Sequence, residues 1–103
     1  MDIQELRHLF NEETENNRPG LKDAIKKAWE QSGVAADDAL FTEAYVYGFN
    51  ELERSIKLLP KESIGDPLEV MIELELQFLA QSGNFAPAQI EDKTREIVAA
   101  IRL

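Results

Sequence analysis

The chain has 103 residues, of which 44% are hydrophobic, and this is the size and composition of one domain with one core. Twenty acidic and eleven basic side chains give a formal net charge of -9, which opposes contact with nucleic acid or anionic membranes and favours basic partners. The absence of cysteine excludes disulfides and thiolate chemistry. We expect a cytoplasmic protein, because the amino terminus lacks the pattern of a secretory signal and no segment has the ~18 apolar residues of a membrane span.

Residues 2–16 are predicted to form the first helix. Asp2 and Glu5 stand in capping-box positions. Apolar residues recur on one face at helical spacing, namely Ile3, Leu6, Leu9 and Phe10. The turn-forming sequence Asn-Asn-Arg-Pro-Gly at residues 16–20 ends this helix.

The second and third predicted helices cover residues 21–32 and about 37–59. The apolar face of the second follows the pattern of an amphipathic helix and consists of Leu21, Ala24, Ile25, Ala28 and Trp29. Gly33 ends this helix, Asp37 or Asp38 caps the next, and Pro60 stops it. The buried stripe of the third helix consists of Phe41, Tyr45, Phe49, Leu52, Ile56 and Leu59. Gly48 falls within this stripe, where a missing side chain lets another backbone approach closely.

Residues 67–82 form the central predicted helix, which is the most apolar segment. The start of this segment has the pattern of a helix amino terminus, with Asp66 as the cap, Pro67 at the first position and Glu69 at the third. The segment also alternates like a strand, but its length up to Gly83 favours a helix. A fifth helix is predicted from Pro87 onward, with Ile90, Thr94, Ile97, Val98 and Ile101 inward. The sequence thus predicts a single all-α domain over residues 1–103, a compact irregular or orthogonal bundle of about five amphipathic helices.

The tripeptide Gln-Ser-Gly occurs twice, at residues 31–33 and 81–83. Each copy closes a predicted helix. A duplicated helix pair would explain the repeat, but shared helix-ending chemistry is the simpler explanation.

Glu75 interrupts the apolar face of the central helix. On a helical wheel it is surrounded by Leu68, Met71, Ile72, Phe78 and Leu79. An unpaired buried carboxylate is costly, so we expect Glu75 to pair with a base of another helix, such as Arg54, Lys57 or Arg95, or to be covered by a neighbouring subunit. The alternative is a carboxyl group with a raised pKa that serves as an acid, a base or a ligand.

Two parts of the sequence have the spacing of a known site but lack other features that the site requires. Glu5 and His8 have the Glu-x-x-His spacing of di-iron bundles, but they lie opposite the apolar face, and the only histidine cannot supply a second copy of the motif. We expect a solvated histidine, with a metal bridged between subunits as the alternative. The second and third helices could form a helix-turn-helix, but Asp37, Asp38 and Glu43 would repel DNA.

Two stretches resemble acyl carrier proteins. IKKAWEQSGVAADD is similar to their first helix and following turn, and GDPLEVMIELE is similar to the helix that follows their Asp-Ser-Leu attachment motif. The resemblance covers about a quarter of the chain. Pro67 stands where the modified serine would be, so we expect neither pantetheine attachment nor any other cofactor.

Apolar residues also occur on the polar side of the third helix. Val46 and Tyr47 share this side with Asn50, and Leu58 lies at its margin. Tyrosine beside aliphatic residues, with charge around them, is typical of a protein-binding surface. Val70 and Leu74 of the central helix could extend this surface or form a dimer contact. The alternative is that another helix of the same chain covers Val46 and Tyr47.

The sequence therefore predicts a small acidic protein-binding module without enzymatic activity, such as a bacterial regulatory adaptor or an inhibitor of a basic nuclease or toxin. The second hypothesis is a carboxylate-based metal or catalytic site that involves Glu75 and is assembled across a homo-oligomer. The third is mimicry of nucleic acid by the acidic face of the first helix, with Glu5, Glu12, Glu13 and Glu15. A homodimer is compatible with each hypothesis.

Overall fold

The computed structural model describes Gln4, His8 and residues 20–35, 37–58 and 66–101. Every element in this part of the chain is helical: α2 (Leu21–Gln31), α3 (Asp38–Leu58), α4 (Pro67–Gln81), the 3-10 turn η2 (Pro87–Gln89) and α5 (Ile90–Ala100). The all-α prediction is confirmed, with four α-helices described where we expected about five. Of the predicted helix over residues 2–16, the structure describes only Gln4 and His8, both of them helical, and residues 59–65 lie outside the described residues.

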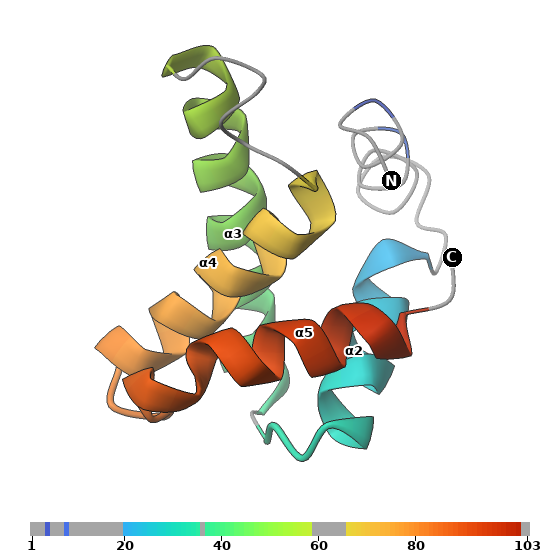
Figure 1. The fold of residues 1–103 in the computed structure, drawn as a ribbon, viewed down its shortest axis with the longest axis vertical. Coiled ribbons are helices and arrows are strands. Elements are labelled where there is room, and N and C mark those ends of the chain that lie inside the picture. The colour runs from blue at the N-terminus through green and yellow to red at the C-terminus, as the bar shows by residue number, and fades with distance from the viewer. Residues whose placement is uncertain (1–3, 5–7, 9–19, 36, 59–65, 102–103) are drawn as a thin grey trace.

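The helix α4 lies at the centre of the described fold, as its apolar sequence predicts. It packs against both α3 and α5, and α5 also packs against α2. In the view of Figure 1, α3 runs vertically and α5 horizontally, and α4 runs diagonally between them. The helices therefore form an irregular bundle. The resulting core draws on all four helices and includes Ile25, Trp29, Phe41, Tyr45, Leu52, Met71, Ile72, Leu76, Leu79 and Ile97.

Both Gln-Ser-Gly segments end a helix in the same way. After α2, the N–H of Gly33 donates to the carbonyl oxygen of Glu30 and the N–H of Val34 donates to that of Trp29, at 3.2 and 2.9 Å. Gly83 and Asn84 make the equivalent bonds after α4. Both glycines have positive φ, 79° and 78°. These are Schellman motifs, so shared helix-ending chemistry accounts for the repeated tripeptide.

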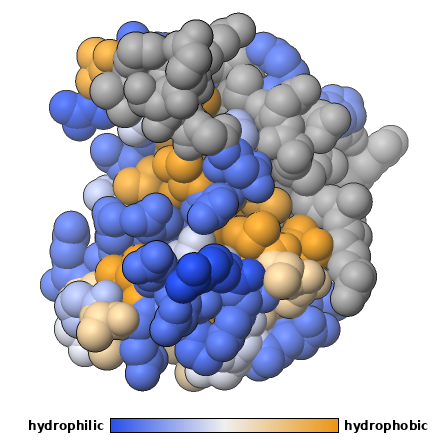
Figure 2. Space-filling model, viewed as in Figure 1, coloured by the Kyte–Doolittle hydropathy of each residue, from blue (hydrophilic) through white to orange (hydrophobic). Residues whose placement is uncertain are grey.

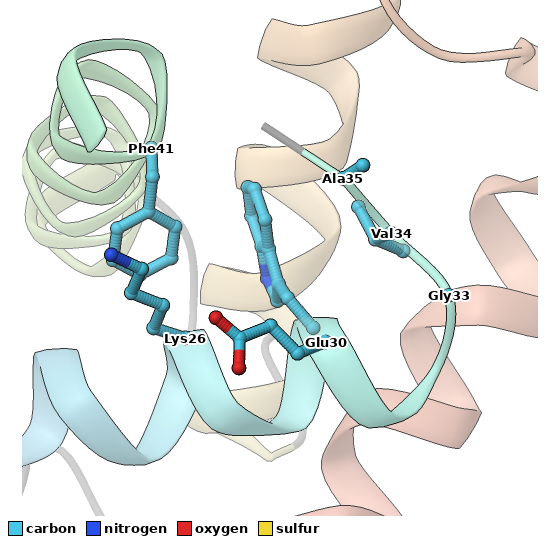
Figure 3. Close-up of a pocket in the computed structure, with 7 residues that line it drawn as sticks. Lys26, Glu30, Gly33, Val34, Ala35 and Phe41 are labelled. Atoms are coloured by element: carbon cyan, nitrogen blue, oxygen red, sulfur yellow. The ribbon is translucent and has the colours of Figure 1, made fainter. Parts of the chain in front are cut away.

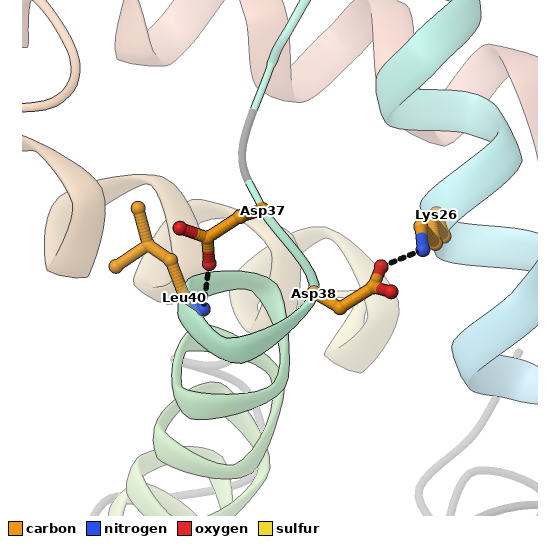
Figure 4. Close-up of polar contacts among 4 residues, drawn as sticks. All are labelled: Lys26, Asp37, Asp38 and Leu40. Atoms are coloured by element: carbon orange, nitrogen blue, oxygen red, sulfur yellow. Dashed lines mark hydrogen bonds and ion pairs between the residues drawn. The ribbon is translucent and has the colours of Figure 1, made fainter.

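Side-chain caps fix the starts of α3 and α4. The backbone N–H of Leu40 donates to Asp37 at 2.7 Å, so Asp37 rather than Asp38 caps α3 (Figure 4). The N–H of Leu68 likewise donates to Asp66 at 3.1 Å. Asp38 instead forms an exposed ion pair with Lys26 of α2 (Figure 4). The hydrogen bond between the two raises the pKa of Lys26 and lowers that of Asp38. Because the pair is exposed to solvent, it contributes little to the free energy of folding.

The last predicted helix differs from the structure at its start. Residues 87–89 form a 3-10 turn in which the N–H of Gln89 donates to the carbonyl oxygen of Ala86 at 3.0 Å. Such turns are frequent where α-helices begin. The inward face is as predicted: Thr94 and Ile97 are buried, and Ile90, Val98 and Ile101 are half-buried.

Candidate functional site

Glu75 is the most unusual residue of the described core. Its side chain has no exposed surface, and neither carboxyl oxygen has a hydrogen-bond partner among the described residues. The wheel prediction that this carboxyl group points into the core is therefore confirmed.

Gly48 of α3 makes room for the Glu75 side chain. A Cβ atom placed on Gly48 would lie 2.7 Å from Glu75 Cγ and 2.9 Å from the backbone oxygen of Met71. These distances are too short for any residue other than glycine, so the backbone of α3 rests directly on α4 here. The predicted close approach at Gly48 is confirmed, and the carboxyl group of Glu75 extends from the point where the two helices touch.

The prediction that Glu75 pairs with a base of another helix is wrong for the described residues. Arg54 pairs with Glu51 of the same helix, with 3.9 Å between Nη1 and Oε1. Arg95 likewise pairs with Asp92 of its own helix, with 2.8 Å between Nη2 and Oδ1. Lys57 is exposed near the end of α3. A helical wheel gives the direction of a side chain, but it does not show whether long side chains elsewhere can turn inward. These bases remain in water, where their charges are solvated.

Burial raises the pKa of Glu75 well above its ordinary value, because the charged form loses its hydration. The indole N–H of Trp29 acts in the opposite direction and lowers this pKa. That contact falls short of a formed hydrogen bond, since Trp29 Nε1 and both Glu75 oxygens lack partners within bonding geometry. The indole therefore offsets only part of the desolvation, and the neutral acid is the form that the core favours.

The hydroxyl group of Thr94 is a further buried polar group without a hydrogen-bond partner in the described part of the chain. Trp29 of α2, Glu75 of α4 and Thr94 of α5 thus each have a buried polar side-chain group without a hydrogen-bond partner among the described residues. Each such group costs free energy, on the order of 1–3 kcal/mol when neutral. The carboxyl group can release or take up a proton, but a substrate cannot touch it in this conformation, because none of its surface is exposed.

The predicted surface residues are only partly exposed. Val46 is 40% exposed and Leu58 is 71% exposed, and Asn50 is also exposed. Tyr47, Val70 and Leu74 are half-buried. Leu58 is twelve positions after Val46, which is about 18 Å along a helix axis. Leu58 therefore lies apart from Val46 rather than beside it.

Tyr47 packs on Phe78, a contact between α3 and α4 that the sequence did not indicate. The ring centroids are 5.3 Å apart and the ring planes are inclined by 39°. Phe78 follows Val70 and Leu74 at intervals of four residues, so these half-buried side chains share one side of α4. That Val70 and Leu74 extend the surface of α3 stays a prediction, and Phe78, which the wheel assigned to the core, is the residue on this side of α4 whose ring contacts α3. The period of four was visible in the sequence, but the contact with Tyr47 depends on how the two helices cross.

A hollow of about 340 Å³ lies beside α2, the turn that follows it and the start of α3. Figure 3 shows Phe41 across the hollow from Val34, with Lys26 and Glu30 rising from α2. The aromatic residues that line it, Trp29 and Phe41, are only 2% and 1% exposed. Their rings pack edge to face at 4.8 Å between centroids. A ligand here would bury little additional apolar area, so the hollow offers a weak basis for binding.

Comparisons with protein families, curated proteins and solved structures find no significant match to this chain.

Of the Glu5 and His8 pair considered as metal ligands, the structure describes only His8. His8 is exposed, as expected, and Glu5 is not among the described residues. Within residues 20–35, 37–58 and 66–101, together with Gln4 and His8, no three metal-ligating side chains are grouped so that they could hold a metal ion. None of the helices in the same residues is long and apolar enough to cross a membrane.

Proposed function

We propose that this protein binds another protein through the surface where α3 and α4 meet. This α3–α4 surface consists of Val46, Tyr47, Asn50, Val70, Leu74 and Phe78. The observation that supports it best is the packing of Tyr47 on Phe78 next to the exposed Val46. It combines an aromatic pair with aliphatic side chains at the boundary of solvent, which is the composition of the centre of many interfaces.

Hydrophilic side chains lie around the apolar areas on one face of the molecule. On the face drawn in Figure 2, apolar areas are separate and lie among hydrophilic residues. Small apolar areas with a polar surround suit a partner that binds reversibly. In this proposal, binding covers the apolar centre and leaves the hydrophilic surround in water.

Charge indicates the kind of partner. The chain carries a net charge of -9, and charge of one sign steers partners of the opposite sign toward the surface. We therefore propose a partner with a basic surface, and a role as a regulatory adaptor or an inhibitor without catalysis. Tyr47 and Val46 would provide affinity, and the acidic surroundings would mainly raise the association rate.

The test compares the wild-type protein with Val46→Asp as bait in affinity capture from the native host, followed by purification of the captured partner and measurement of Kd. We expect the variant to weaken binding at least tenfold, because the new carboxylate would be desolvated in the interface. Ala99→Asp on α5 is the matched control, since Ala99 is also exposed and gains the same charge. It should retain wild-type affinity.

Two further measurements sharpen this test. Circular dichroism of both variants should show native helix content, which separates loss of binding from loss of fold. The association rate should fall as salt concentration rises, because salt screens charge steering. Equal binding by Val46→Asp and the wild-type protein would contradict the proposed surface.

The other hypotheses from the sequence have no specific support. Glu75 has no exposed surface, so a metal or catalytic role would require α4 to reorient toward a second subunit. The acidic residues of the proposed nucleic-acid mimic lie outside the described part of the chain. Sedimentation equilibrium would test separately whether the chain forms a homodimer.

A further inference from the structure

The α3–α4 surface and the buried carboxyl group share a single helix crossing. Tyr47 and Gly48 are adjacent on α3, and Glu75 and Phe78 lie one turn apart on α4. Gly48 lies against Glu75 Cγ, and Tyr47 packs on Phe78 with 5.3 Å between ring centroids. A movement that separates the helices at Gly48 would therefore also separate the two rings.

A charge on Glu75 would require such a movement. The carboxyl oxygens have no hydrogen-bond partner in the described part of the chain, and a buried carboxylate needs water or donors to be stable. At Gly48 itself α3 contributes only backbone to the contact, so opening at this point displaces no α3 side chain, whereas Tyr45 and Phe49 beside it are buried in the core. Water that enters here reaches Glu75 by displacing the contact between the two helices.

The helices around Glu75 offer no counter-charge. No charged side chain contributes to the raised pKa of Glu75, which has only burial and the Trp29 indole as its causes. From α3 the titratable group in the core is the phenol of Tyr45, and Tyr47 lies at the surface. On α5, Lys93 and Arg95 bond Glu96 and Asp92. The other charged groups of α2 and α4 are exposed or half-buried, namely Lys22, Asp23, Lys26, Lys27, Glu30, Glu69 and Glu73.

We propose that the proton on Glu75 regulates the α3–α4 surface: the neutral acid keeps α3 and α4 in contact at Gly48, and its ionisation opens that contact and separates Tyr47 from Phe78. The role of this switch in partner binding rests on the proposed function, but the switch itself is a property of the isolated chain. Because the proposed interface is centred on the packed pair of Tyr47 and Phe78, the partner should bind more tightly as the pH falls and the surface closes.

The experiment is an NMR titration of the isolated protein. Trp29 is the only tryptophan, so its indole N–H gives a single signal that reports on Glu75. The nuclear Overhauser effect between the rings of Tyr47 and Phe78 reports on the surface. As the pH is raised, we expect the indole signal to shift and the ring-to-ring effect to disappear with the same midpoint, while the amide signals of α2 and α5 stay dispersed.

Variants separate this switch from general effects of pH. Glu75→Gln should keep the ring-to-ring effect at every pH, and Glu75→Met provides the same test if the amide does not fit. Glu73→Gln is the matched control, because Glu73 is an exposed acid on the same helix, and it should behave like the wild-type protein. All these signals are measured without a partner, so failure of the proposed function would leave them unchanged.

Three results would overturn the proposal. The ring-to-ring effect could persist in the wild-type protein above the midpoint of the indole signal. It could disappear with pH in Glu75→Gln or Glu75→Met as it does in the wild-type protein. All amide signals could collapse together with it, which would mean that ionisation unfolds the chain instead of opening one contact.

Discussion

Replacing Glu75 with glutamine should change how the stability of this protein depends on pH. Glutamine has nearly the shape of the acid and no charge, so it should fit against Gly48 as the protonated acid does. The folded protein raises the pKa of Glu75 well above the ordinary value of 4.5, because burial removes the hydration of the charged form. The folded state therefore holds this proton more tightly than the unfolded state.

Because the folded state holds the proton more tightly, the stability that Glu75 contributes decreases as the pH rises. Below pH 4.5 the acid is neutral in both states, and its contribution to stability is fully present. As the pH rises above that value, the unfolded state loses the proton first and gains relative stability. The free energy of unfolding of the wild-type protein should fall, relative to that of Glu75→Gln, by about 1.4 kcal/mol per pH unit. The difference becomes constant above the pKa of the folded state.

Urea denaturation at a series of pH values measures this difference directly. The midpoint and slope of each curve give the free energy of unfolding, and the pH at which the difference stops growing gives the pKa of Glu75 in the folded protein. Glu73→Gln controls for the loss of one negative charge, and we expect it to change stability by no more than about 0.5 kcal/mol. A Glu75→Gln protein that is less stable than the wild-type protein by the same amount at every pH would refute this reasoning.

Three further substitutions test the packing and the caps, each by urea denaturation. Gly48→Ala should destabilise the protein by about 1–3 kcal/mol despite the better helix propensity of alanine, because the new methyl group meets both Glu75 and the backbone of α4; an increase in stability would show that the helices separate easily. Asp37→Ala should cost about 1 kcal/mol through loss of the bond from Leu40, and an unchanged midpoint would argue against this cap. Gly33→Ala should cost roughly 1 kcal/mol through its φ of 79°, although nothing lies within 4 Å of the added atom, and a neutral result would mean that the turn adopts another conformation.

Local sequence chemistry predicts the ends of the helices well. The caps at Asp37 and Asp66 and the stops at Gly33 and Gly83 each depend on residues within one turn of the chain, so sequence spacing is enough to identify them. The close approach at Gly48 was also predictable, because glycine within a buried stripe leaves a gap that another helix can fill.

Contacts between helices were harder to predict. The direction of Glu75 follows from the helical period, but its lack of a partner depends on where the bases of α3 and α5 lie, and these bases bond acids on their own helices. The contact between Tyr47 and Phe78 depends on the crossing of α3 and α4. The hollow beside Trp29 depends on the path of the turn after α2. None of these features is encoded by spacing within one helix.

Glu75 is a buried acid whose pKa lies well above the ordinary glutamate value of 4.5. A carbon-13 NMR titration of the glutamate side-chain carboxyl groups tests it most directly, with Glu75→Gln used to assign the signal. We expect the Glu75 signal to keep the position of the protonated acid through the pH range around 4.5, the ordinary pKa of a glutamate, and to move only at clearly higher pH. A Glu75 signal that moves near pH 4.5 or below would contradict the burial of a neutral acid here.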